Sequence, residues 1–105
     1  MGFFHRATKI VDLGDGNTVT LRKAAFRESQ EAASAASSVK DGTITIDWPL
    51  YRLELLKRCV TAWEGEGFDG LPPTPENIDQ LPISIGNKLA DEVQELSTLS
   101  DSEGN

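Results

Sequence analysis

The side chains that most often carry out chemistry are scarce in this chain. It has one histidine, His5, and one cysteine, Cys59. Catalysis by a Ser–His or Cys–His pair would have to use His5, and no local signature of such a site surrounds any serine or Cys59. A zinc site built from His and Cys would need partners that the sequence does not contain. The sequence therefore predicts no catalytic residue, no metal site and no cofactor.

Acidic and glycine-rich segments offer three weaker signals. Carboxylate pairs such as Glu64 with Glu66 lie in solvated segments, where nothing favours the perturbed environment that acid–base catalysis needs. The spacing of Gly65, Gly67 and Gly70 matches a dinucleotide-binding motif, but we expect it to follow a helix, and its acids would repel pyrophosphate. The segment 15–17 lacks the alternating aspartates and closing glutamate of a calcium loop, which favours a turn.

The charge of the chain is negative and unevenly distributed. Its 105 residues have a formal net charge of −7, and residues 64–105 hold ten acidic side chains against one basic side chain, Lys88. Such a field repels a phosphate backbone, which argues against nucleic acid as a partner. No apolar run is long enough to cross a bilayer, and residues 1–6 lack the apolar core of a signal peptide. A single cysteine is typical of a protein made in a reducing cytoplasm.

Periodicity and turn residues predict one small domain over residues 1–99, followed by a polar tail at 100–105. Apolar residues alternate on both sides of a glycine-rich turn, which indicates a β-hairpin over 9–22. Ile44 and Ile46 alternate with polar residues and favour a short extended segment. We expect helices at about 23–38, 48–63, 75–81 and 83–99. The predicted fold class is mostly α: a small, helix-dominated α+β domain with an N-terminal β-hairpin.

Local signals support two of the helix starts and the core. Asp47 followed by Pro49, and Thr74 followed by Pro75, are typical N-terminal caps. Apolar residues then recur at helical spacing in both long segments, which predicts two packed stripes. The residues expected in the core are Leu50, Leu53, Leu56, Val60, Trp63, Ile85, Leu89 and Val93.

Four apolar side chains lie where they could contact a partner. Trp48 and Tyr51 fall in the first turn of the segment 48–63, and Phe68 and Leu71 lie in or beside the glycine-rich loop. Aromatic residues dominate the energetic hot spots of interfaces, which makes these four the candidate partner-binding residues. The alternative is that they cover the core, since isolated surface hydrophobes are ordinary.

The order of motifs from Trp48 to Leu96 resembles the small tail assembly chaperones of long-tailed, siphovirus-type bacteriophages. The resemblance lies in a tryptophan at the end of a helical segment (Trp63), the glycine-rich acidic loop 64–70, the Thr-Pro-Glu at 74–76, the Leu-Pro at 81–82 and the terminal amphipathic segment. Its motifs are short, and the hairpin at 9–22 is compatible with it.

The resemblance implies a protein that is not an enzyme and that binds the tape measure protein while the tail is built. Members of that family keep the tape measure protein soluble, help to recruit tail tube subunits, and leave before the virion matures. Many are made in a short form and in a longer frameshifted form. The resemblance thus implies that the protein acts in the host cytoplasm. Separately, the small predicted core favours self-association as a further contact.

Two other readings remain open. The chain could be a permanent structural tail or connector component of the virion, or an unrelated acidic adaptor such as a nucleic-acid mimic. A mimic needs acidic side chains in rigid rows, whereas many acids here fall in a loop and a polar tail.

Overall fold

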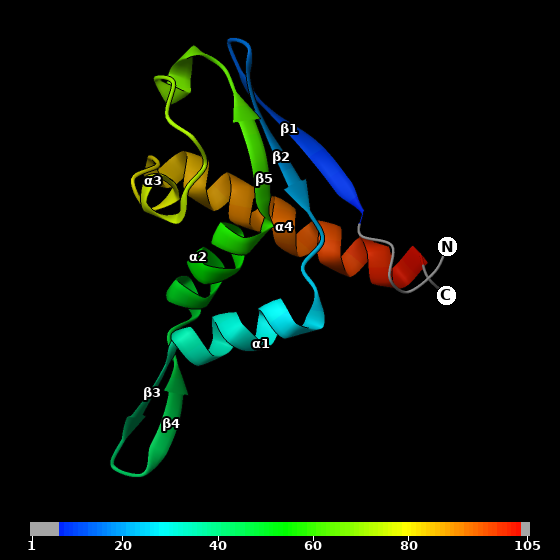
Figure 1. The fold of residues 1–105 in the computed structure, drawn as a ribbon. Coiled ribbons are helices and arrows are strands. Elements are labelled where there is room, and N and C mark those ends of the chain that lie inside the picture. Colours follow the sequence, from blue (N-terminus) through cyan, green and yellow to red (C-terminus); the bar gives the residue numbers. More distant parts are fainter. Residues whose placement is uncertain (1–6, 104–105) are drawn as a thin grey trace.

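A three-stranded antiparallel sheet forms one half of the fold. The computed structural model describes residues 7–103, with side chains described for 7–97. The strands are β1 (Thr8–Gly14), β2 (Asn17–Arg22) and β5 (Val60–Glu64), in the order β1-β2-β5. The central strand β2 therefore pairs with its neighbour in sequence on one side and with a distant segment on the other. Figure 1 shows the long helix α4 (Ile83–Glu103) running across this sheet.

Two Asp-Gly turns create the two hairpins of the chain. Asp15 and Gly16 have φ angles of 55° and 81° and connect β1 to β2. Asp41 and Gly42 have φ angles of 53° and 77° and connect β3 (Ser37–Lys40) to β4 (Thr43–Ile46). Positive φ at both central residues defines the type I′ turn, whose twist matches that of the strands, and Asp-Gly tolerates it. The sequence therefore specifies both hairpins locally.

The expected helix at 48–63 is wrong in its last quarter. Helix α2 (Trp48–Cys59) ends at Cys59, and the chain continues directly into β5. Val60 pairs with Leu21, and Trp63 pairs with Val19 on the central strand. The β-branched and aromatic residues of this segment fit a strand, and pairing with β2 overrides a spacing that also suits a helix.

This strand and the β3–β4 hairpin correct the predicted fold class. The fold is α+β, with a three-stranded and a two-stranded sheet, and it is not mostly α. The sequence indicated extended structure at Ile44 and Ile46, but it did not reveal that residues 37–46 form a complete hairpin.

The remaining helices follow their sequence signals with different boundaries. Helix α1 (Phe26–Ala35) is shorter than the predicted span 23–38. A single 3-10 turn, η1 (Glu66–Phe68), follows β5, and α3 (Pro75–Asp79) leads into α4. Helix α4 continues to Glu103, beyond the predicted end at 99 and into the segment expected to be a polar tail.

The core lies between the inner face of the sheet and helices α1, α2 and α4. Val19, Leu21, Cys59 and Leu89 are fully shielded from solvent. Of the predicted core residues, Leu56, Leu89 and Val93 are buried, whereas Leu53, Val60, Trp63 and Ile85 are partly buried against the core, and Leu50 is only half-buried. The buried side of α2 is formed by Leu55, Leu56 and Cys59. The apolar stripe predicted for this helix differs from the buried side because two of its members, Val60 and Trp63, belong to β5.

The β3–β4 hairpin, here called the arm (Ser37–Ile46), projects from the body of the molecule in Figure 1. Its base is held where the Asp47 N–H donates to the Ala36 carbonyl at 2.9 Å. Val39 and Ile44, which face each other across the hairpin, are 72% and 71% exposed. The arm therefore leaves apolar side chains in solvent.

Candidate partner-binding groove

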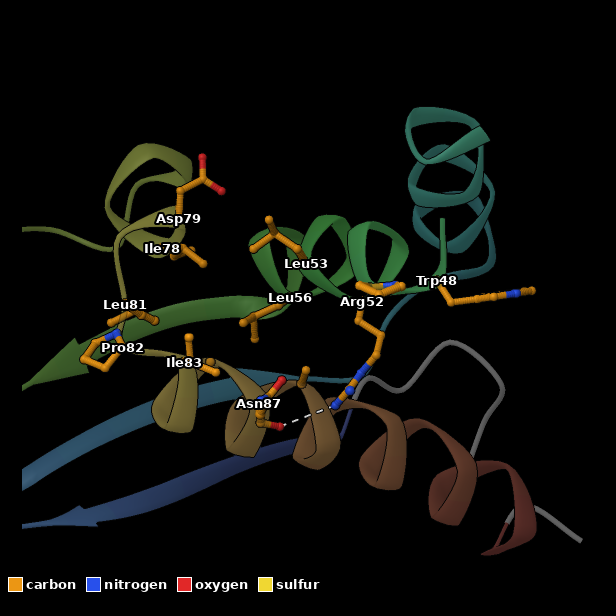
Figure 2. A pocket seen from close by; sticks show the side chains of 13 residues that line it. Trp48, Arg52, Leu53, Leu56, Ile78, Asp79, Leu81, Pro82, Ile83 and Asn87 are labelled. Carbon is orange, nitrogen blue, oxygen red and sulfur yellow. Dashed lines mark hydrogen bonds between the residues drawn. The ribbon is translucent and has the colours of Figure 1, made fainter. Parts of the chain in front are cut away.

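An apolar groove of about 480 Å³ opens between α2, α3 and α4. Figure 2 shows side chains of α2 facing those of α3, the connection after it and the start of α4 across this space. Such a volume lies within the range typical of binding sites. The lining residues are Trp48, Pro49, Arg52, Leu53, Leu56, Ile78, Asp79, Leu81, Pro82, Ile83, Gly86, Asn87 and Ala90.

Local helix signals position the three walls. The Asp47 carboxylate accepts a hydrogen bond from the Leu50 N–H at 3.1 Å, which caps α2 as the sequence predicts. The Thr74 hydroxyl accepts from the Asn77 N–H at 3.2 Å, which confirms the predicted start of α3. Pro82 then separates α3 from α4. Proline has no backbone N–H, so it cannot form the hydrogen bond that would continue α3. Each wall is thus fixed by its own terminal residues.

The floor of the groove on α4 is made of small residues. Gly86 and Ala90 lie one helical turn apart, and a Cβ atom added at Gly86 would meet nothing within 4 Å. The other side of α4 packs on the core through Leu89 and Val93. Small side chains on the open side allow the backbone of a bound segment to approach α4 closely.

Arg52 crosses from α2 to α4 and provides the polar contact inside the groove. Its guanidinium pairs with the Asp91 carboxylate. It also donates to the Asn87 carbonyl at 3.4 Å, and Figure 2 shows this second contact. Its Nε atom is buried and has no hydrogen-bond partner among the described residues. An unsatisfied buried donor carries a free-energy cost, so the contact between α2 and α4 at Arg52 is incompletely satisfied.

An ion-pair network on α2 reaches α3 at the edge of the groove. The Lys57 ammonium lies 2.9 Å from Asp79 and 3.4 Å from Glu54, and Arg58 lies 3.0 Å from Glu54. The hydrogen bond to Asp79 and the charge of Glu54 raise the pKa of Lys57. The hydrogen bond from Arg58 and the charge of Lys57 lower the pKa of Glu54. Both shifts favour the charged forms of Lys57 and Glu54, and the pair between Lys57 and Asp79 joins α2 to α3.

Of the four predicted partner-binding residues, the structure brings only Trp48 to the groove. Trp48 is 61% exposed and meets the ring of Tyr51 edge-on at 5.6 Å. Tyr51 is half-buried, and its hydroxyl lies 2.9 Å from the Ser29 hydroxyl, so this side chain connects α2 to α1.

Phe68 and Leu71 have a structural role at the other end of the molecule. The Phe68 ring is buried and stacks on Trp63 at 4.5 Å. The Trp63 indole N–H donates to the Leu71 carbonyl at 2.6 Å, while the Leu71 side chain is 52% exposed. These residues close the glycine-rich loop and do not line the groove.

Sequence reasoning missed most of the groove. Its unassigned members include Ile83, which is 84% exposed, together with Ile78, Leu81 and Ala90. A signal was present on α4, where Ile83, Gly86 and Ala90 recur at helical spacing beside the core stripe. Two apolar faces on one helix indicate that it packs on two surfaces, and one of these is left open here.

The glycine-rich loop follows strand β5, not a helix as expected from the sequence. No helix opens directly after it, because η1 and an extended stretch precede α3. The Gly67 N–H donates to the Asn17 side-chain oxygen at 2.9 Å, which joins the loop to the β1–β2 turn. The glycines thus serve a close backbone approach, and the dinucleotide motif lacks its strand–loop–helix context.

The chemical inventory of the described part adds no other site. Among the residues described, no group of three or more His, Cys, Asp or Glu lies where it could hold a metal ion. His5 lies outside the described residues. Within residues 7–103, no helix is both long enough and apolar enough to span a bilayer. Comparisons with protein families, with curated proteins and with solved structures give no match to this chain.

Proposed function

We propose that this protein is a tail assembly chaperone of a long-tailed bacteriophage, which binds an amphipathic helix of the tape measure protein and keeps it soluble. The observation that supports this most directly is the open apolar groove between α2, α3 and α4. An amphipathic helix placed in such a groove buries its apolar side against the groove and keeps its polar side in water. The motif order from Trp48 to Leu96 supplies the identity of the partner.

The contact surface favours affinity from apolar burial. Trp48 and Ile83 are exposed at the groove and can close over a bound helix, while Gly86 and Ala90 admit its backbone. The charged groups at the groove, Arg52 and Asp79, are already paired within the chain. The net charge of −7 then acts mainly on the rate of encounter with a basic partner.

Co-expression with the tape measure protein tests the proposal. The tape measure protein is expected to be insoluble alone and soluble with the wild-type chain. Ile83→Asp places a charge in the groove and should abolish this effect; aspartate suits the first turn of a helix, so the fold should survive. Ile10→Asp is the matched control, because Ile10 is 68% exposed on β1 and does not line the groove.

Three outcomes would contradict the proposal: failure of the two wild-type proteins to co-purify, equal loss of solubility in both variants, or no loss in either. Purified virions give a further check, since a chaperone is expected to be absent from them. A fixed copy number in mature particles would support a structural tail or connector component instead.

A further inference from the structure

The arm is strongly specified by the sequence and yet incompletely paired. Its turn, Asp41-Gly42, adopts the type I′ geometry, and the Ser38 and Thr45 hydroxyls lie 3.1 Å apart across the strands. Within the part of the chain that the structure describes, β3 and β4 form a sheet of their own with no third strand. An isolated two-stranded hairpin is marginally stable in water, and a further strand stabilises it. The arm therefore has the geometry of a sheet that another chain completes.

The register shows which backbone groups face outward. Hydrogen-bonded pairs alternate with non-hydrogen-bonded pairs along the arm. The Asp47 N–H donates to the Ala36 carbonyl, which places Ser38–Thr45 and Lys40–Thr43 among the hydrogen-bonded pairs. In an antiparallel ladder the intervening residues point their N–H and C=O groups away from the partner strand. On β4 these residues are Ile44 and Ile46. Their backbone groups form an edge that is ready to pair.

Edge β4 lacks the features that usually prevent pairing between molecules. Free edges are commonly blunted by charged residues, proline or a bulge. The outer strand β1 carries Lys9, Asp12 and a register irregularity before Gly14. Strand β3 carries Lys40, whereas β4 consists of Thr-Ile-Thr-Ile only. The other edge strand, β5, carries Glu64 and pairs with β2 through a register irregularity. Among these edges, that of β4 is thus the least protected against another strand.

The sequence of β4 is complementary to itself. We propose that the arm is a self-association element in which β4 of one molecule pairs antiparallel with β4 of a second copy, about a two-fold axis at Thr45. In this register Ile44 faces Ile46 of the second copy, and both pairs use outward-pointing backbone groups. Two arms then form a four-stranded sheet with Val39, Ile44 and Ile46 of both copies on one face, because alternate residues share a face.

Charge also favours this contact. Two copies with a net charge of −7 repel each other, so a contact must form where charge is balanced. The arm holds one Lys and one Asp, at positions 40 and 41. In the proposed register Thr43 faces Asp47 of the second copy, and Lys40 lies two strand spacings away, about 10 Å, on the same face. Each lysine can therefore reach an acidic group of the other copy, twice by symmetry.

A contact through one short strand is small, so the dimer should be weak. Interfaces well below about 1,200 Å² are typical of transient complexes. We expect a monomer at about 10 µM and a dimer that becomes populated toward about 1 mM. Sedimentation equilibrium across this range gives the association constant. A wild-type chain that remains monomeric throughout would overturn the proposal.

Cysteine cross-linking tests the register directly. Thr45 would face its own counterpart as a non-hydrogen-bonded pair, with Cα atoms about 4.5 Å apart, a distance that suits a disulfide. Thr45→Cys should give a covalent dimer under oxidised glutathione at least ten times faster than Ser38→Cys. Ser38 lies on the same face but three strand spacings, about 14 Å, from its counterpart. Equal rates, or faster cross-linking through position 38, would overturn the proposed pairing.

A matched pair of proline variants tests which edge is used. Ile44→Pro and Val39→Pro both remove an outward-pointing N–H and leave the ladder within the arm intact. Only the first blocks β4, so it should weaken association at least ten-fold more than the second. A greater loss from Val39→Pro would contradict the assignment to β4. Circular dichroism should be unchanged in both variants, which shows that they fold. Disulfide formation by Thr45→Cys tests the same pairing without a proline, so the result does not depend on misfolding.

Discussion

The side chain of Asn17 explains why glycine occupies two positions in the loop after β5. Its oxygen accepts the Gly67 N–H at 2.9 Å, and a Cβ atom added at Gly65 would lie 2.1 Å from the same oxygen. Gly65 also has a φ angle of 130°, a region that side chains rarely adopt. The backbone of the loop therefore lies directly against the Asn17 side chain at the β1–β2 turn.

We expect Gly65→Ala to destabilise the fold by about 2 kcal/mol or more, because it adds a clash to backbone strain. Gly70→Ala is the control: φ is +74° there and nothing lies within 4 Å, so only strain of about 1 kcal/mol applies. Urea unfolding measures both. Asn17→Ala shortens the side chain that clashes, so adding it to Gly65→Ala should recover part of the lost free energy of unfolding. Strictly additive free-energy changes for the two substitutions would contradict the contact.

At the scale of elements, α2 has two apolar sides with different roles. Leu55 and Cys59 face the core, whereas Leu53 and Leu56 pack against the core and also line the groove. The helix therefore contributes to stability through both sides, and only the side with Leu53 and Leu56 also borders the space open to a partner.

Leu56→Ala should reduce the free energy of unfolding by about 2–5 kcal/mol, as is usual for a buried leucine. Leu56 is 2% exposed. Leu50→Ala, on the half-buried side of the same helix, should cost less than about 1 kcal/mol. Chemical denaturation monitored by tryptophan fluorescence distinguishes them, and equal losses would contradict the assignment of the helix faces.

Elements with local signals could be predicted, and elements that depend on distant pairing could not. The caps at Asp47 and Thr74 and the turn at Asp15-Gly16 need only adjacent residues. Strand β5 was assigned to a helix because its spacing suits both periods and its partner, β2, lies far away in sequence. The groove was missed for the same reason, since its three walls are brought together only by the tertiary fold.

For the whole molecule, an excess of acidic side chains sets the response to pH. The network of Glu54, Lys57 and Arg58 offsets part of the repulsion within a chain of net charge −7. Because the folded state holds the pKa of Glu54 below its ordinary value of 4.5, the folded state takes up this proton at a lower pH than the unfolded state does. Its contribution to stability is complete above that value and is lost as pH falls through the lower, folded pKa.

The free energy of unfolding should therefore be nearly constant from pH 7 toward pH 5 and decrease below about 4.5. Glu54→Gln should flatten this decrease by up to about 1 kcal/mol, the usual scale for a partly exposed pair. Glu66→Gln makes the same change of charge at an exposed position outside the network, so it separates the loss of one negative charge from the loss of the ion pairs. Urea titrations at pH 7 and pH 3.5 measure the difference, and equal slopes in the two variants would count against the network.

The position of β2 in the sheet has a consequence for the time course of folding. One neighbour, β1, lies next to it in sequence, whereas the other, β5, begins at Val60, long after β2 ends at Arg22. Closing such a long loop slows folding, because its entropy must be lost before the strands pair. During synthesis the first hairpin emerges with one side of β2 open and waits for the segment after α2. A nascent chain that has reached only Cys59 thus contains the centre of the sheet without the strand that completes it.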